Sequence, residues 1–173
     1  MTVRTEKEVK QLYEQAFPKE ERRPFFMLIR QCKKGVMEIL TVEEDGEVLG
    51  IAIASCYETI VLLEYFAVVS KERGNGIGGR ALELIKKRYQ AKRLVLEIEQ
   101  PEENREDMKF RRQEFYKRHG FLDIGVFLMF HGVPMKLLSY EGKKVSYEEY
   151  KQHYKKTAGR ILTCYLNIKP NCR

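Results

Sequence analysis

Apolar residues recur at helical spacing in the first part of the chain. Over residues 6–17, four of them would share one face of a helix, and Pro18 would end that helix. That face is formed by Val9, Leu12, Tyr13 and Ala16. A second short apolar segment, residues 24–32, begins near Pro24, a residue that is favourable in the first turn of a helix. We therefore expect two helices before residue 35.

From residue 36 onward the apolar pattern becomes typical of β-strands. Asp45-Gly46 is a strong signal for a hairpin turn, and it separates the apolar residues 36–42 from the segment Val48 to Tyr57. A third apolar run, Thr59 to Val69, follows with almost no connection. Three strands joined in this way should form an antiparallel meander.

A glycine-rich segment, Arg73 to Gly79, follows the third strand. It precedes a helical pattern over Arg80 to Tyr89 and a short apolar strand, Arg93 to Glu99. Strand, glycine loop, helix and strand in this order indicate a βαβ unit, whose two strands must be parallel.

The rest of the chain alternates helices and strands. We expect a helix ended by Gly120, two strands, a helix capped by Ser146 with Glu149 at the capping-box position, and a last strand. Their ranges are Met108 to His119, Phe121 to Phe130, Val133 to Tyr140, residues 146 to about 156, and Ile161 to Ile168. The sequence predicts one domain, residues 1–173, of the α+β (mixed α/β) class with a mostly antiparallel sheet.

Composition narrows the class of protein. The chain is 43% hydrophobic and 33% charged, which is typical of a globular domain, and its longest apolar runs are far below the roughly 20 residues needed to cross a bilayer. The first residues lack the pattern of a secretory signal, so we expect a cytoplasmic protein without membrane association. The four cysteines are scattered, which favours free thiols and no metal site.

The formal net charge of +7 predicts attraction to polyanions. Nucleic acid, an anionic surface and a phosphorylated cofactor all fit, as does a basic face that simply contacts solvent. The chain contains no recognisable nucleic-acid motif, which argues against nucleic acid as a partner.

The glycine segment is suited to binding a phosphate group, because closely spaced glycines let several main-chain N–H groups point into one concavity. A Walker A loop is excluded, since Arg80-Ala81 follows Gly79 where that loop needs Lys-Ser/Thr. Gly74, Gly76 and Gly79 match a dinucleotide fingerprint literally, with Glu97 or Glu99 about 20 residues on. Four residues separate them from the strand, however, and the preceding strands look antiparallel, so this interpretation is the weaker one.

Two motifs together resemble a known family. The segment Arg73-Gly74-Asn75-Gly76-Ile77-Gly78 matches the signature Arg/Gln-x-x-Gly-x-Gly/Ala, and Tyr116 to Phe121 looks like the element Tyr-x-x-x-Gly-Phe. In this order and about 40 residues apart, they resemble the GNAT superfamily of acyl-CoA N-acyltransferases. The resemblance spans about residues 36–130 and implies a three-layer fold with helices on both faces of the sheet. It also implies acetyl-CoA as cosubstrate and an amine as acceptor, with residues from about 141 to 173 as a C-terminal extension.

The resemblance assigns cofactor contacts. Main-chain groups of Phe66, Ala67 and Val68 would hold the pantetheine arm, although the same residues also read as a buried strand. Arg73 would lie near the phosphates, and the pyrophosphate would bind Gly74, Asn75, Gly76, Ile77, Gly78 and Gly79. The 3′-phosphate of the cofactor would meet a basic residue that the sequence does not single out, with Lys71, Arg80 and Lys109 as candidates.

The attacking amine must lose a proton, since an ammonium group has a pKa near 10. Glu64 lies inside the apolar third strand, where a carboxylate is costly without a partner or a task, so we expect it to be the general base. Glu97 and Glu99 are rivals, followed by His119 and His131. A structural salt bridge of Glu64 is the alternative.

The departing thiolate needs a proton, and the resemblance assigns this role to Tyr116; a core tyrosine is the alternative. One departure from the family pattern is Lys109, which stands where many relatives have Asn. Arg111 and Arg112 could bind an acidic group or face solvent. The sequence therefore predicts an N-acetyltransferase with an unidentified amine acceptor. A non-catalytic protein of the same fold that binds acyl-CoA or nucleic acid is the alternative, and a homodimer through the last strand stays open.

Overall fold

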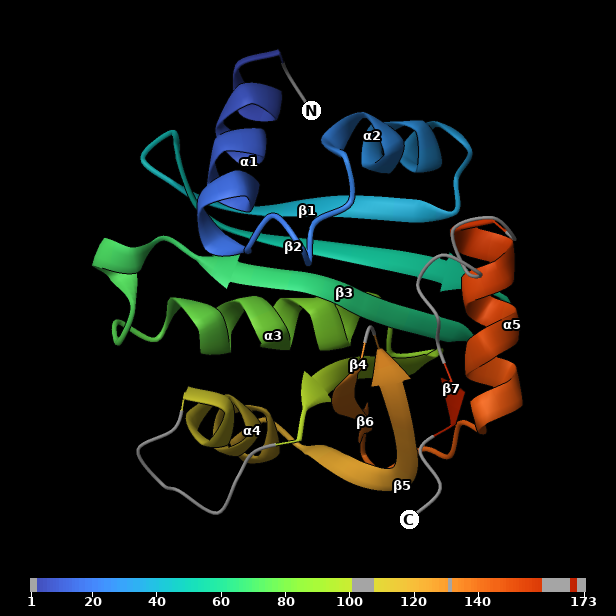
Figure 1. Cartoon of the computed structure of the whole chain (residues 1–173). Coiled ribbons are helices and arrows are strands. Elements are labelled where there is room, and N and C mark those ends of the chain that lie inside the picture. Colours follow the sequence, from blue (N-terminus) through green and yellow to red (C-terminus); the bar gives the residue numbers. More distant parts are fainter. Residues whose placement is uncertain (1–2, 101–107, 131, 160–168, 171–173) are drawn as a thin grey trace. The chain divides into compact units, whose positions relative to one another are not determined.

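The structure is a computed structural model that describes residues 3–100, 108–130, 132–159 and 169–170. Figure 1 shows its helices and strands, which divide between two compact units. The first comprises Met1–Ser55 and Leu63–Arg88, and the second Cys56–Leu62 and Tyr89–Arg173. The single domain expected from the sequence stays a prediction.

In its described residues the first unit contains three α-helices, one short 3-10 helix and three neighbouring strands or parts of strands. Its elements are α1 (Val3–Ala16), α2 (Phe25–Lys33), β1 (Met37–Glu44), most of β2 (Glu47–Tyr57), the end of β3 (Ile60–Val68), the short 3-10 helix η1 (Ser70–Glu72) and α3 (Ile77–Arg88). The strands lie in the order β1-β2-β3, and β1 pairs with β2 antiparallel. Asp45 and Gly46 both have positive φ, 51° and 78°, as the predicted hairpin turn requires.

The core of the first unit forms where the apolar faces of α1 and α2 meet β2 and β3. Tyr13 lies at its centre, because its ring contacts Phe17, Phe25 and Tyr65 at centroid distances of 5.7, 5.9 and 4.9 Å. The four apolar positions that predicted α1 are explained by this core, since Val9, Leu12 and Tyr13 are buried and Ala16 packs against them.

The second unit contains α4 (Met108–Arg118), α5 (Tyr147–Thr157) and four strands besides the first residues of β3. The strands are β4 (Arg93–Glu99), β5 (Phe121–Phe130), β6 (Val133–Tyr140) and the two-residue β7 (Lys169–Pro170). Their order is β3-β4-β6-β5-β7, and β6 pairs antiparallel with both β4 and β5. The predicted capping box of α5 is confirmed, with Ser146 and Glu149 bonded to each other's main-chain N–H groups.

Most predicted elements are confirmed, and so is the fold class, a mixed α/β chain with a mostly antiparallel sheet. The strand–helix–strand order β3, α3, β4 also agrees, and β3 neighbours β4 in the sheet. One boundary differs in a way that matters, because α3 begins at Ile77 instead of Arg80. The last predicted strand, Ile161 to Ile168, lies outside the described residues.

None of the helices in the described part of the chain is both long and apolar enough to cross a membrane.

Candidate active site

The glycine loop between η1 and α3 is exposed and built on left-handed main chain. Gly74 and Gly76 have φ values of 92° and 76°, which side chains other than glycine rarely adopt. The turn is tied back to η1 twice by Asn75. Its main-chain N–H donates to the Glu72 carbonyl at 3.4 Å, and its side-chain amide donates to the Glu72 carboxylate at 3.0 Å.

The first turn of α3 presents unpaired main-chain donors beside this loop. The Arg80 N–H donates to the Gly76 carbonyl at 3.0 Å, so the N–H groups of Ile77, Gly78 and Gly79 precede the first helical bond. The buried Ile77 side chain anchors the helix start. Two glycines in the first turn leave these donors uncovered by side chains, and a helix N-terminus favours an anion.

Among the cations considered for phosphate contacts, Arg73 differs from the others. Its side chain is exposed and makes no ion pair with the described residues. Lys71 pairs with Glu47 at 3.4 Å, and Arg80 pairs with Glu44 at 3.9 Å. Lys109, in the second unit, pairs with Glu99. Among these four cations, Arg73 is therefore the one that can bind a phosphate without first breaking an ion pair with a carboxylate of the described residues.

Strand β3 is partly exposed at alternate residues near its end. Residues 64, 66 and 68 are partly exposed, whereas Tyr65 and Ala67 are buried. The Glu64 side chain is only 4% exposed, so the accessible surface of this residue belongs largely to its main chain. A strand with accessible N–H and C=O groups can pair with an extended ligand.

The β3 segment lies tightly against β2 at Gly50. A Cβ atom at Gly50 would approach the Ala67 carbonyl oxygen to 3.0 Å. The sequence analysis did not single out Gly50, because a glycine in a strand indicates a close approach without naming the partner.

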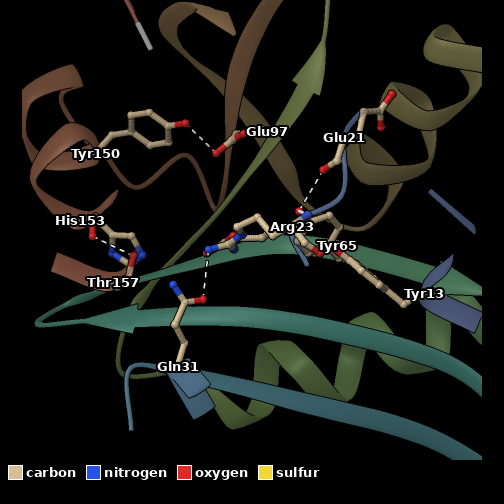
Figure 2. Close-up of polar contacts among 10 residues, drawn as sticks. Tyr13, Glu21, Arg23, Gln31, Tyr65, Glu97, Tyr150, His153 and Thr157 are labelled. Carbon is tan, nitrogen blue, oxygen red and sulfur yellow. Dashed lines mark hydrogen bonds and ion pairs between the residues drawn. The ribbon is translucent and has the colours of Figure 1, made fainter. Parts of the chain in front are cut away.

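Glu64 forms a buried ion pair with Arg23, from the segment between α1 and α2. The two side chains are 4% and 6% exposed, and the Arg23 Nη1 group also donates to Gln31 Oε1 at 3.2 Å (Figure 2). The other oxygen of the carboxylate, Glu64 Oε1, is buried and has no hydrogen-bond partner among the residues that the structure describes. The salt bridge that the sequence left as an alternative for Glu64 is thus present, yet it occupies one oxygen only.

The main chain of Arg23 is held as firmly as its guanidinium group. Its N–H donates to Tyr65 Oη at 3.3 Å, and its carbonyl accepts from Tyr13 Oη at 3.1 Å. The Tyr65 hydroxyl in turn donates to the Glu21 carbonyl at 3.0 Å. Arg23, Gln31 and Tyr65 were all missed by the sequence analysis.

In the second unit, Tyr116 is a buried residue on α4. It is 8% exposed and packs against Phe115 and Phe121 at centroid distances of 5.3 and 5.8 Å. Burial raises the pKa of Tyr116 to about 12, with a smaller opposing effect of Arg112. Its hydroxyl makes no hydrogen bond within the described part of the chain, so it keeps its proton through the neutral range and has that proton to donate.

Gln113 lies one helical turn before Tyr116 and faces the same way. It is 7% exposed, and its Oε1 atom is buried without a hydrogen-bond partner in residues 3–100, 108–130, 132–159 and 169–170. An unsatisfied buried amide is costly, which suggests that a ligand or water meets it in the working protein. The spacing to Tyr116 was visible in the sequence, but the burial of Gln113 was not. Arg111 and Arg112 are exposed.

The rivals of Glu64 are engaged elsewhere in the second unit. Glu97 accepts a hydrogen bond from Tyr150 Oη at 2.7 Å (Figure 2), and Glu99 pairs with Lys109. His119 packs its ring on Phe115 at 4.8 Å. His131 lies outside the described residues.

Known proteins resemble this chain in sequence and in fold. A family model described as an acetyltransferase (GNAT) domain matches residues 37–122. A solved structure of a GNAT-family protein from Bacteroides thetaiotaomicron is 26% identical with a TM-score of 0.73, covering 91% of this chain and 94% of its own. Comparison with curated proteins finds no match.

Two further solved structures share the fold at lower identity. An aminoglycoside 6′-N-acetyltransferase complexed with coenzyme A is 16% identical with a TM-score of 0.65, covering 80% of this chain and 91% of its own. The ribosomal-protein-S18-alanine N-acetyltransferase from Escherichia coli is 13% identical with a TM-score of 0.63, covering 81% and 89%. The chain belongs to the GNAT superfamily of acetyltransferases.

Proposed function

We propose that this protein transfers an acetyl group from acetyl-CoA directly to an amine acceptor. The observation that carries the proposal is the loop Arg73–Gly79, in which left-handed glycines lead into a helix whose first three N–H groups have no helical partner. Membership of an acetyltransferase family supports acetyl-CoA as the donor. The acceptor is left open, because the relatives named above act on unlike molecules, an aminoglycoside and a ribosomal protein.

Cofactor binding in this proposal depends mainly on main-chain groups. The segment Gly74–Gly79 receives the diphosphate, mainly through the N–H groups of Ile77, Gly78 and Gly79 at the start of α3. Arg73 adds a positive charge that has no competing carboxylate among the described residues. Main-chain groups of Phe66, Ala67 and Val68 pair with the pantetheine arm, in a stretch where residues 66 and 68 are partly exposed. One N–H of this segment polarises the thioester carbonyl, a contribution of a few kcal/mol, roughly 3, to the barrier.

Proton transfer is assigned to two side chains. Glu64 accepts a proton from the amine through Oε1, directly or through a water, as nitrogen attacks the carbonyl carbon. Tyr116 donates its hydroxyl proton to sulfur as the C–S bond breaks. The N–C bond formed and the C–S bond broken balance the reaction, so no covalent enzyme intermediate and no metal is needed.

The proposal is tested by binding and by turnover. Calorimetry with CoA and with acetyl-CoA should show binding, and a thiol reagent should detect CoA release when a panel of amines is supplied. Tyr116→Phe should slow release on the best amine by at least about tenfold without loss of acetyl-CoA binding. Binding without release on any amine would instead support the non-catalytic acyl-CoA protein, and absence of binding would exclude both.

A further inference from the structure

Arg23 is an unusual residue for a connecting segment, because it is buried and both its guanidinium group and its main chain contact neighbouring elements. Its guanidinium group contacts Gln31 on α2 (Figure 2) and Glu64 on β3. Its main chain contacts Tyr13 on α1 and Tyr65 on β3. Most charged residues in connecting segments face water. Arg23 instead joins α1, α2 and β3 at the carboxylate proposed as the base.

The contacts require the shape of arginine. Nη1 donates to the Gln31 amide oxygen, and Nη2 faces Glu64 Oε2, so one planar group aligns two partners at once. A lysine ammonium group at the end of a flexible chain would supply the charge without this alignment. The proline that follows, Pro24, restricts the Arg23 main chain to extended conformations and so limits the directions its side chain can take.

The result is a carboxylate with two unlike oxygens. Glu64 Oε2 is held by Arg23, whereas Oε1 is buried and unpartnered in the part of the chain that the structure describes. The guanidinium group of Arg23 also lies over the Tyr65 ring, with its central carbon 5.9 Å from the ring centroid. A base needs a free lone pair at a set position, and this arrangement provides one.

We propose that Arg23 is a positioning residue that holds the Glu64 carboxylate by its Oε2 atom and aims its Oε1 atom at the acceptor amine. This inference rests on the proposed function, in which Glu64 is the base. Arg23 touches neither substrate nor cofactor and acts through Glu64 alone. Because Arg23 also contacts α1 and α2, changes in these two helices would reach the base through it.

The titratable groups around the pair limit what a pH profile can report. Besides Arg23 and Glu64 these are Tyr13 and Tyr65, which contact the Arg23 main chain. Burial, and next Tyr65, raise the pKa of Tyr13 above its ordinary value, so Tyr13 stays neutral across the range used for assays. A change in the acidic limb of the profile therefore reports on the Glu64 carboxylate.

The test compares Arg23→Gln and Arg23→Lys with the neighbouring control Arg22→Gln. Arg22 is partly exposed, donates to the Glu14 carbonyl at 3.1 Å and lies outside the proposed machinery. On the best amine of the panel, Arg23→Gln should lower kcat about 100-fold with the Kd for acetyl-CoA unchanged. The acidic limb of the pH profile of kcat should move to higher pH in this variant, because an ionised carboxylate without its cation protonates more easily. Arg23→Lys should be intermediate, and Arg22→Gln should match the wild type.

Two further variants keep the test decisive if Arg23→Gln folds poorly. These are Glu64→Gln and the double variant Arg23→Gln/Glu64→Gln, and the double variant leaves no buried charge of this pair unpaired. The two should have the same kcat within about threefold, because the effects of residues that act as one unit are not additive. Equal stepwise losses from both changes would overturn the inference. So would an unchanged pH profile in folded Arg23→Gln protein, which would make Arg23 a structural residue.

Failure of the proposed function would look different. If the wild type binds no acetyl-CoA or releases no CoA with any amine, the enzyme itself is not an N-acetyltransferase. If the wild type is active and Glu64→Gln is equally active, Glu64 is not the base and Arg23 has nothing to position.

Discussion

The two candidate regions of the first unit work by opposite means. The loop Arg73–Gly79 is exposed, and its chemistry lies in main-chain N–H groups that glycines leave uncovered. The cluster around Arg23 and Glu64 is buried, and its chemistry lies in side chains drawn from separate elements. The folded state should therefore tolerate removal of a charge from the loop, whereas removal of a charge from the buried cluster should destabilise it.

The largest expected effect comes from the same substitution made in both regions. Arg23→Met should lower the free energy of unfolding by about 3–5 kcal/mol, because it leaves the buried Glu64 charge without its partner. Arg73→Met should change it by less than about 0.5 kcal/mol, since Arg73 is exposed. Urea denaturation of both variants measures the difference. Equal losses would mean that the Arg23 pair is not buried as described.

The second prediction concerns rate. Glu64→Gln should lower kcat by about 100-fold or more and leave the Kd for acetyl-CoA unchanged, because the amide cannot accept the proton. The matched control is Glu47→Gln, an exposed carboxylate near the loop whose partner is Lys71. Rates on the best amine, with calorimetry for the cofactor, test both. If Glu64→Gln weakened acetyl-CoA binding instead, cofactor binding and proton transfer would not depend on separate regions.

The third prediction concerns Tyr116, a buried side chain of the second unit, and its contribution to stability. The pKa of Tyr116 is raised to about 12, so the folded protein keeps this proton while an unfolded tyrosine loses it near pH 10. The stabilisation is complete below pH 10 and is lost as the pH rises to 12, at most about 3 kcal/mol. Tyr116→Phe should lose less stability than the wild type over this interval. Parallel losses would show that the Tyr116 hydroxyl is open to water.

The contrast also explains what the sequence could predict. Glycines at fixed spacing between a strand and a helix are a local pattern, so the loop was identified together with most helices and strands. The start of α3 was missed because Gly78 and Gly79 have low helix propensity, which the neighbouring packing of Ile77 overrides.

The buried cluster left a weaker trace. Glu64 was noticed because a charge interrupts an apolar strand, but its partner comes from a run with five charged residues, 19–23, that no periodicity distinguishes. Arg23 and Glu64 are 41 positions apart, and only the packing of α1 and α2 on β3 selects which charge is buried. Gln113 was missed for a similar reason, since burial of a polar helix position depends on what covers it.

The smallest expected effect gives the cleanest test of the exposed loop. Gly76 and Gly35 have nearly equal φ values, 76° and 72°, and open space where a Cβ would lie. Valine at either position should therefore strain the main chain to a similar degree, about 1–2 kcal/mol of unfolding free energy. Gly76→Val should also weaken acetyl-CoA binding about tenfold, because the displaced N–H groups no longer converge, whereas Gly35→Val should not. Calorimetry and urea denaturation on both variants separate strain from binding. If both variants lost stability to the same degree and neither lost affinity for acetyl-CoA, the diphosphate would not bind the main-chain N–H groups at the start of α3.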